Sequence, residues 1–223
     1  MPETAREAPA APRPLVCALP KGRVLKQLLP LLSRAGLPTE ILQGDDRALI
    51  REDPQIPLRF ILLKPDDVPT YVDYGAADLG VVGRDVLWER GYDLYAPVEL
   101  GVGRCRLVVA GVSTVLPDPA LCPTLRVATK FPALAADHFR RHGRSCETIF
   151  VQGSVELAPL VGLADVIVDL VESGETLRQN GLSEIATITS ISSVVVVNRA
   201  ALKLHGDRVR PLLAQLRAAA AAT

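Results

Sequence analysis

Short apolar runs alternate with segments of helical periodicity along most of the chain. In 24–35, leucines at positions 25, 28, 29 and 32 recur at helical spacing and stop before Gly36. Strands are predicted at 15–19, 58–63, 79–82, 106–110, 126–128, 148–151 and 166–171, extended segments at 185–189 and 193–197, and helices at 24–35, 67–74, 85–89, 133–142, 155–161, 175–180 and 199–221. This alternation predicts α/β layers with a largely parallel sheet.

The alternation of strands and helices starts again near residue 104, which divides the chain into two similar blocks of elements. We expect 15–104 together with 187–223 to form one lobe and 105–186 to form a second. A ligand would then bind in the cleft between the lobes, near the carboxyl ends of strands. Residues 1–14 are rich in Ala and Pro and lack an apolar core, which predicts a disordered leader and neither a signal peptide nor a membrane segment.

The segment 166–181 carries the strongest indication of a ligand. A buried strand ends at a Ser-Gly turn, and a short helix follows. Such a turn at a helix N-terminus presents free N–H groups to an anion. Ser173 and Thr176 can add hydroxyl donors, while Asp169 and Glu172 can accept hydrogen bonds from sugar hydroxyls. This combination suggests a phosphorylated ribose, although a strand, turn and helix also occur together in proteins that bind no ligand there.

Two basic segments are candidates for contacts with phosphate groups. Lys21 and Arg23 stand at the start of the first predicted helix, where cations are unfavourable unless an anion lies between them. A phosphate clamp and a solvated basic turn explain them about equally well. Arg47 and Arg51 lie in a loop-like region and have the planar fork that suits phosphates. Neighbouring acids make a surface ion pair the favoured explanation of Arg47 taken alone.

Further motifs have ordinary structural explanations. Ser154, after Gly153, is expected to be the N-cap of helix 155–161, and a ligand contact is the less favoured alternative. His138 and His142 share a helical face but have no evident third ligand nearby, so a solvated basic face is favoured over zinc. We therefore predict no metal site. Neither a G-x-S-x-G motif nor a Cys/His pairing supports nucleophilic catalysis.

The composition narrows the choice of partners and compartment. The 223 residues balance 25 basic against 25 acidic side chains, contain no long basic run, and include only 4% aromatics. These values argue against nucleic acid as a partner. The 48% of hydrophobic residues is enough for a substantial core. None of the four cysteines has C-x-x-C spacing, so we predict small buried hydrophobes in a reducing cytoplasm.

Four segments, taken in order, resemble the short form of the ATP phosphoribosyltransferase family: 19–23 (LPKGR), 67–72 (DVPTYV), 75–80 (GAADLG) and 153–165 (GSVELAPLVGLAD). The resemblance implies a two-lobed α/β fold like that of the type II periplasmic binding proteins, with the ligand cleft between the lobes. It implies transfer of the 5-phosphoribosyl group from phosphoribosyl pyrophosphate to N1 of ATP with release of pyrophosphate, the first step of histidine biosynthesis. It also implies substrate-bound Mg²⁺.

Roles of individual residues follow from the same resemblance. Lys64 stands where the family often has an arginine, so a bidentate contact there is lost while the charge is kept. The resemblance also changes the interpretation of Arg47, from a member of a surface ion pair to a functional residue. The catalytic groups would be Arg23, Arg47 and Lys21; phosphoribosyl pyrophosphate would be bound by Asp169, Glu172, Ser173, Gly174, Glu175, Thr176 and Leu177; and ATP would be bound by Lys21, Gly22, Arg23, Arg47, Gly153 and Ser154.

The resemblance also implies a partner. The long form of the family carries a further domain that binds histidine, and we expect none here because the chain ends soon after its terminal helix. A hetero-oligomer with a separate subunit resembling histidyl-tRNA synthetase is therefore expected. The alternative is a non-catalytic two-lobed protein that closes on a small anion, which usually needs an export signal. A Rossmann-like phosphoribosyltransferase is disfavoured because Asp169 and Glu172 are not adjacent.

Overall fold

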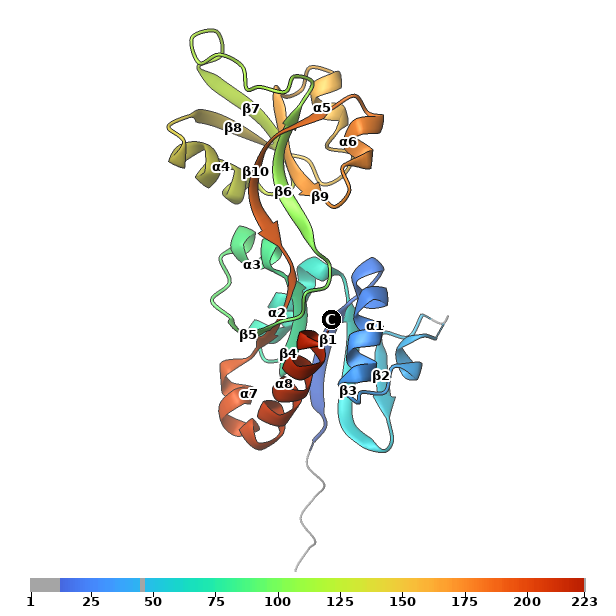
Figure 1. Ribbon diagram of the computed structural model, residues 1–223. Helices are drawn as coiled ribbons and strands as arrows, with labels where there is room; N and C mark the ends of the chain where they lie inside the picture. The colour runs from blue at the N-terminus through green and yellow to red at the C-terminus, as the bar shows by residue number, and fades with distance from the viewer. Residues whose placement is uncertain (1–12, 45–46, 223) are drawn as a thin grey trace, which may run out of the picture.

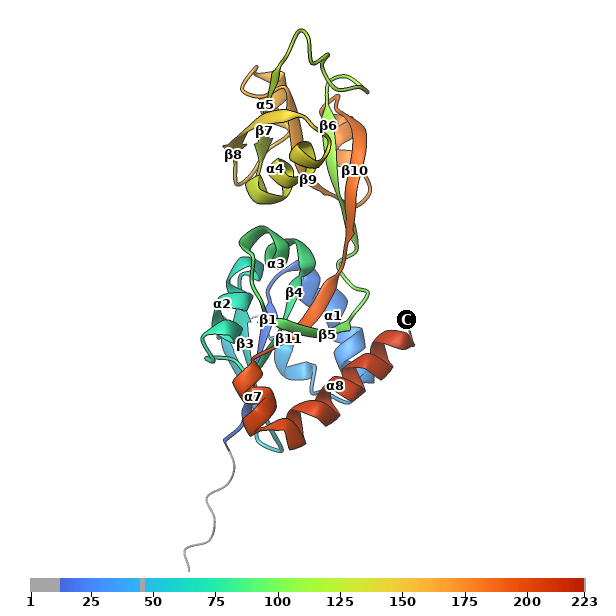
Figure 2. The ribbon, with the colours of Figure 1, turned by 90° about the vertical axis from the view of Figure 1, so that its left-hand side faces the viewer.

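A computed structural model describes residues 13–44 and 47–222 and shows two lobes joined by two crossing segments (Figures 1 and 2). The predicted α/β architecture with two lobes is confirmed. Each lobe has its own sheet and its own apolar clusters. No helix in the described part of the chain combines the length and the apolar composition needed to cross a membrane.

The first lobe is built on a six-stranded sheet with parallel strands at its centre. β1 pairs in parallel with β3 and β4, because the chain crosses over through helices between them. The strand order is β2-β3-β1-β4-β11-β5, with the bounds Ile50–Asp53, Ile56–Leu63, Leu15–Pro20, Leu79–Gly83, Ser193–Val197 and Tyr95–Glu99.

Helices cover both faces of this sheet. The leucines that predicted the first helix pack against one face as α1 (Arg23–Arg34), beside the C-terminal helix α8 (Gly206–Ala221). The other face is covered by α2 (Val68–Asp73) and α3 (Arg84–Arg90), whose valines pack on β4 and β11. The remaining elements are α7 (Arg199–Leu204) and two 3-10 turns, η1 (Glu40–Leu42) and η2 (Pro65–Asp67).

The second lobe has a five-stranded sheet between helices. α4 (Pro132–Arg141) covers one face, while α5 (Leu157–Leu160) and α6 (Glu175–Gln179) cover the other. β7 pairs in parallel with β8 and β9, so the carboxyl ends of these three strands lie at one edge. The strand order is β10-β6-β9-β7-β8, with the bounds Ser183–Ile191, Cys105–Gly111, Val166–Val171, Thr124–Thr129 and Ser145–Phe150.

The sheets are mixed, and the prediction of largely parallel sheets was wrong outside the parallel strands β3-β1-β4 and β9-β7-β8. β11 runs antiparallel to β4 and β5, and β6 runs antiparallel to β9 and β10. The reason is that the chain crosses between lobes along β6 and returns along β10 and β11. β10 stays paired with β6 as far as Ile191, whereas we expected the return to the first lobe at residue 187.

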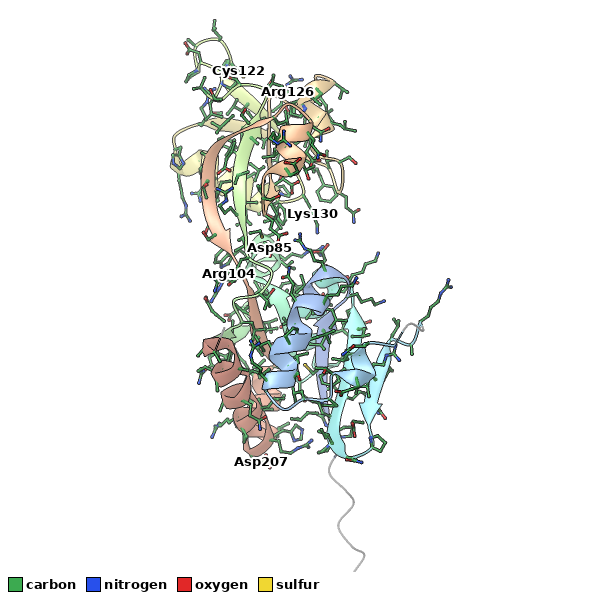
Figure 3. The ribbon with its side chains drawn as sticks, turned by 45° about the vertical axis from the view of Figure 1, so that its right-hand side comes forward. Asp85, Arg104, Cys122, Arg126, Lys130 and Asp207 are labelled. Atoms are coloured by element: carbon green, nitrogen blue, oxygen red, sulfur yellow. The ribbon has the colours of Figure 1, made fainter. Side chains whose placement is uncertain are left out.

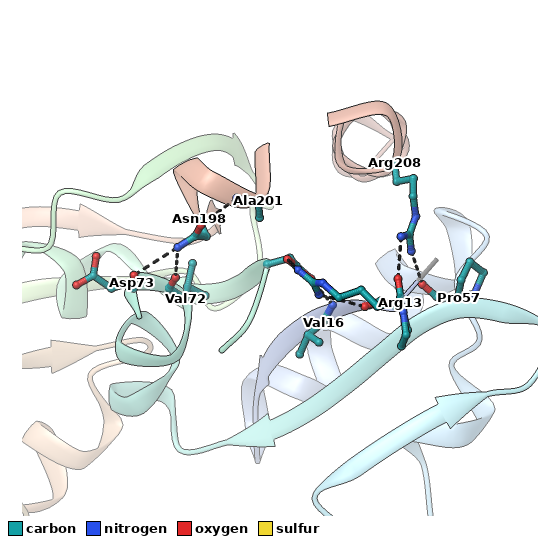
Figure 4. A network of polar contacts seen from close by, with 10 residues as sticks. Arg13, Val16, Pro57, Val72, Asp73, Asn198, Ala201 and Arg208 are labelled. Atoms are coloured by element: carbon teal, nitrogen blue, oxygen red, sulfur yellow. Dashed lines mark hydrogen bonds and ion pairs between the residues drawn. The ribbon is translucent and has the colours of Figure 1, made fainter. Parts of the chain in front are cut away.

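Two predicted helices also differ from the structure. The long terminal helix is divided at His205 into α7 and α8, and the Asn198 side chain caps α7 by accepting a hydrogen bond from the N–H of Ala201 at 3.0 Å (Figure 4). The helix expected at 155–161 is the single turn α5. It begins later because Ser154 has φ 51°, and Glu156, not Ser154, is its N-cap.

The predicted leader ends in an ion pair between the exposed Arg13 and the buried Asp78. Arg13 donates two hydrogen bonds to the carboxylate of Asp78, at 2.7 and 2.9 Å, and Asp78 also accepts from the N–H of Val16. Arg208 of α8 donates to the carbonyl of Arg13 (Figure 4). Residues 1–12 of the predicted leader lie outside the described residues.

Candidate active site between the lobes

A pocket of about 210 Å³ lies where the second lobe faces the start of α1. It is lined by all seven residues predicted to bind phosphoribosyl pyrophosphate, from Asp169 to Leu177, together with Arg23, Cys105 and Glu156. Arg23 belongs to the first lobe, and the segment 169–177 belongs to the second. The structure therefore brings together predicted residues that are far apart in sequence.

The loop between β9 and α6 has the shape of an anion cradle. Gly174 has φ 79° at the N-cap of α6, a left-handed conformation that glycine adopts without steric cost. The hydroxyl of Ser173 accepts a hydrogen bond from the N–H of Glu175 at 3.4 Å. Because the first N–H groups of a helix have no intrahelical acceptor, those of Thr176 and Leu177 remain for a ligand.

Two side chains of this loop point away from the cradle. The carboxylate of Glu175 accepts hydrogen bonds from Arg178 and Gln179, which hold its pKa below the usual range. Leu177 is buried in the apolar cluster that α5 and α6 form against the sheet. A contact from either residue to a ligand would therefore come from its backbone.

Asp169 lies on β9 at the inner wall of the pocket. Burial raises the pKa of its carboxyl, and the nearby charge of Glu156 acts in the same direction. The N–H of Leu170 donates to its Oδ1 at 2.8 Å. Within the described residues Asp169 forms no ion pair, so the carboxylate remains able to accept hydrogen bonds from a bound molecule.

An ion pair between Arg23 and Glu172 crosses the cleft between the lobes. The Arg23 guanidinium donates from Nη1 to Oε2 of Glu172. Both side chains are well exposed, at 64% and 45%, so water screens the pair and it adds little to stability. Arg23, which lines the pocket, is thus paired in this structure with a carboxylate of the protein itself.

The turn before α1 gives the helix an open N-terminus. Gly22, its N-cap, has φ 81° and ψ −140°, which is a backbone conformation almost restricted to glycine. No side chain caps α1, and its first turn contains no acidic residue. The N–H of Lys21 donates to the carbonyl of Leu63 at 2.8 Å, while the side chains of Lys21 and Lys64 are exposed beside this end.

Arg47 is exposed and lies outside the pocket lining. It precedes β2, which runs antiparallel to β3, and the N–H of Leu62 donates to the carbonyl of Leu49. This register places Arg47 at the edge of the sheet where β3 and β1 end. It therefore lies on the same edge as Arg23, two strands to the side.

Gly153 and Ser154 follow β8 at the carboxyl edge of the second sheet and are exposed. Neither lines the pocket, although Glu156 two residues later does. Glu156 was not selected from the sequence. Its place at the end of a loop that follows a parallel strand was the available signal.

Cys105 and Lys130 are further residues near the cleft that the sequence reasoning did not select. Burial raises the pKa of the Cys105 thiol to about 11, so the thiol is neutral at physiological pH. Lys130 follows β7 and forms an ion pair across the cleft with Asp66, at 2.8 Å. Its position directly after a parallel strand could have indicated it.

The histidine pair belongs to the surface of α4. The ring centroids of His138 and His142 lie 4.4 Å apart, and Nδ1 of His142 is 2.8 Å from the carbonyl oxygen of His138. Burial and the neighbouring His142 lower the pKa of His138. Among residues 13–44 and 47–222, no group of three His, Cys, Asp or Glu residues has the arrangement of a metal site.

Known proteins resemble the chain over most of its length. A family model described as HisG, ATP phosphoribosyltransferase, matches residues 64–218. The ATP phosphoribosyltransferase of Sorangium cellulosum is 56% identical over 94% of this chain and 97% of that protein, and the one of Halorhodospira halophila is 52% identical over the same shares.

A solved structure extends the comparison to the fold. The ATP phosphoribosyl transferase (HisG:HisZ) complex from Thermotoga maritima contains a chain with a TM-score of 0.78 and 33% identity, covering 94% of this chain and 100% of that one. The predicted two-lobed fold of the type II periplasmic-binding-protein kind is confirmed. The chain belongs to the ATP phosphoribosyltransferase family.

Proposed function

We propose that the pocket around Arg23 and the loop 172–177 binds phosphoribosyl pyrophosphate. The chain, as an ATP phosphoribosyltransferase, transfers the 5-phosphoribosyl group to N1 of ATP and releases pyrophosphate. The observation that supports this site best is that a cation of one lobe faces an anion cradle of the other. A substrate with a phosphate at each end of a ribose suits this arrangement.

The 5-phosphate is held by the N–H groups at the start of α6 and by the hydroxyls of Ser173 and Thr176. Asp169 accepts hydrogen bonds from the ribose hydroxyls. When the substrate enters, Arg23 exchanges the Glu172 carboxylate for the pyrophosphate. Glu172 is then released to the ribose, where it accepts a further hydrogen bond.

This chemistry needs positive charge and no general base. Adenine N1 carries a lone pair and no proton, so the nucleophile is ready as it stands. Charge develops on the leaving pyrophosphate and on the sugar, and a group placed to stabilise such charge contributes about 3–4 kcal/mol. Arg23, Lys21 and Arg47 serve the leaving group and the ATP phosphates from the open end of α1 and the start of β2.

The ATP side of the site is the less enclosed one. We place the ATP phosphates near Lys21, Gly22, Arg23 and Arg47, and the remainder of the nucleotide toward Gly153 and Ser154 across the cleft. The metal enters as the magnesium complex of phosphoribosyl pyrophosphate, and Mg²⁺ neutralises the phosphates that leave. The substrate phosphates, not a cage of protein side chains, hold the ion.

A partner subunit is proposed by analogy with the Thermotoga maritima complex. We expect a hetero-oligomer with a HisZ subunit that resembles histidyl-tRNA synthetase. Histidine inhibition would then act through that subunit. A purified chain that is fully active and histidine-sensitive alone would contradict this proposal. The free thiols of the four cysteines fit a reducing cytoplasm as the compartment.

The decisive experiment measures pyrophosphate release from ATP and phosphoribosyl pyrophosphate with Mg²⁺, first with this chain and then with the HisZ subunit added. Release should depend on both substrates. Arg23→Ala and Arg47→Ala should each lower kcat/KM by about a hundredfold or more. Arg199→Ala removes an exposed ion pair to Asp93 within the first lobe, so this variant should remain active.

The outcomes separate the proposals. Wild-type release that is unaffected by Arg23→Ala would place the leaving group elsewhere. Release that appears only after the HisZ subunit is added would mean an obligate complex. Silence under both conditions, with phosphoribosyl pyrophosphate still raising thermal stability, would support the alternative of a non-catalytic anion-binding protein, which the curated relatives do not favour.

A further inference from the structure

Glu89 of α3 is hydrogen-bonded across the cleft to the beginning of α4. Its Oε1 accepts from the N–H of Ala133 at 2.9 Å, and its Oε2 accepts from the N–H of Leu134 at 3.0 Å. α3 belongs to the first lobe and α4 to the second. Both oxygens of one carboxylate are thus bound to the backbone of the opposite lobe.

This contact completes a helix that lacks a cap of its own. α4 begins at Pro132, its N-cap Phe131 has no capping side chain, and its first turn contains no acidic residue. The N–H groups of a first turn need acceptors, and negative charge is favourable at that end. Glu89 supplies both, so the cap of a helix in one lobe comes from the other lobe.

A second polar contact fixes the same segment. Nζ of Lys130 lies 2.8 and 3.0 Å from the two carboxylate oxygens of Asp66 in η2. Lys130 lies at the junction of the lobes, near Asp85 (Figure 3). Both side chains of the pair are about one third exposed. Residues 130–134 of the second lobe are therefore held at two points by η2 and α3.

Apolar packing does not replace these contacts on this side. Beside them, α3 and α4 border a groove of about 680 Å³ that contains Trp88 and His138. Trp88 remains 43% exposed there. Because the groove leaves this side of the junction open to solvent, the hydrogen bonds of Glu89 and the ion pair of Lys130 are the contacts that bear on the spacing between the lobes here.

We propose that Glu89 and Asp66 are positioning residues that hold the two lobes at the spacing required for phosphoribosyl transfer. This inference rests on the proposed function, in which Arg23 of the first lobe and the loop 172–177 of the second act on one substrate. Neither Glu89 nor Asp66 lines the pocket that contains Arg23. Glu89 and Asp66 act by setting the distance between Arg23 and the loop 172–177.

The test compares Glu89→Ala and Glu89→Gln with wild type in four measurements: kcat, ligand Kd, X-ray scattering and amide hydrogen exchange. Because misplacement of reacting groups by about 1 Å costs on the order of a hundredfold, Glu89→Ala should lower kcat at least tenfold. The Kd for ribose 5-phosphate, measured by calorimetry, should change by less than about threefold, since the cradle that binds its phosphate lies within the second lobe. Glu89→Gln keeps one acceptor oxygen and should retain intermediate activity.

Two structural readouts distinguish positioning from a loss of folding. Small-angle X-ray scattering should show a larger radius of gyration for Glu89→Ala, and the amides of Ala133 and Leu134 should exchange hydrogen faster, while core amides of both sheets keep their protection. Asp93→Asn, which breaks an exposed ion pair inside the first lobe, should match wild type in every measurement.

Unchanged kcat in Glu89→Ala would overturn the inference. A lower kcat with unchanged scattering, or with core amides exchanging faster throughout, would also overturn it, because the role would then be local or structural. If wild type released no pyrophosphate even with the HisZ subunit added, the proposed function would fail, and scattering and exchange would still show whether Glu89 sets the spacing.

Discussion

At the scale of single residues, Asp169 and Glu172 of the site have surroundings that favour binding of a ligand. Asp169 is partly buried without an ion pair among the described residues, and burial raises its pKa. Glu172 is bound to the arginine that we assign to the substrate. A bound sugar phosphate would supply Asp169 with hydroxyl donors and would replace Glu172 as the partner of Arg23.

Asp169→Asn should raise the stability of the folded protein and lower its activity. Asparagine has no charge to desolvate, and its Oδ1 can keep the hydrogen bond from the N–H of Leu170. The variant should therefore unfold at a higher temperature than wild type at neutral pH. Loss of a hydrogen bond from the ribose to a charged acceptor should lower kcat/KM by about ten- to a hundredfold, corresponding to roughly 1.5–3 kcal/mol.

The difference in melting temperature between Asp169→Asn and wild type should depend on pH in a definite direction. Because the folded pKa of Asp169 is raised, its contribution to stability is fully present below the ordinary pKa of aspartate, about 3.9, and is lost as the pH rises through the folded value. The gain in melting temperature should thus be present near neutrality and disappear in acid. A gain that persists unchanged at pH 3 would contradict this account of Asp169.

At the scale of elements, the buried strands could be predicted, and the edge strands of the first sheet could not. β1, β4 and β9 are apolar runs in the core, whereas β2 (IRED) and β5 (YAPVE) carry polar residues and a proline on exposed edges. The loop 172–177 was found because its signal is local. The pairing of Arg23 with Glu172 could not be found, because only the fold brings together residues 149 positions apart.

The glycines at the two ends of α1 separate the function of this helix from its stability. Gly22 and Gly36 have φ of 81° and 76°, and a Cβ at either position would meet no atom within 4 Å. Alanine therefore strains the backbone alone, by about 1–3 kcal/mol at each position. Gly22→Ala should in addition lower kcat/KM about tenfold or more, because it redirects Arg23 and the open N–H groups of the helix.

Urea unfolding and pyrophosphate release, measured on both variants, check this expectation. Gly36→Ala should lose stability and keep the kcat/KM of wild type under conditions where it is folded. If both variants lost activity in proportion to their stability, the N-terminus of α1 would have no special part in the reaction.

At the scale of the whole molecule, the two lobes have separate cores and limited contact. Two crossing segments join them, hydrogen-bonded to each other between Val102 and Ser193, and polar contacts at Lys130, Glu89 and Arg23 bridge the cleft. Separate cores allow the lobes to unfold in separate steps in the free protein. A ligand that contacts both lobes must then couple their unfolding.

The single tryptophan makes this coupling measurable, because Trp88 lies on α3 in the first lobe while the phosphate cradle lies in the second. At a hundredfold excess over its Kd, phosphoribosyl pyrophosphate should stabilise the folded state by about 2.7 kcal/mol. That stabilisation should appear in the thermal transition of Trp88 fluorescence, since Arg23 carries it to the first lobe.

Ribose 5-phosphate lacks the pyrophosphate and should raise only the part of the circular dichroism transition that belongs to the second lobe. Arg23→Ala should make phosphoribosyl pyrophosphate behave like ribose 5-phosphate. If the Trp88 transition moved equally with both ligands in wild type, the pyrophosphate would not reach Arg23, and the substrate would lie within the second lobe alone.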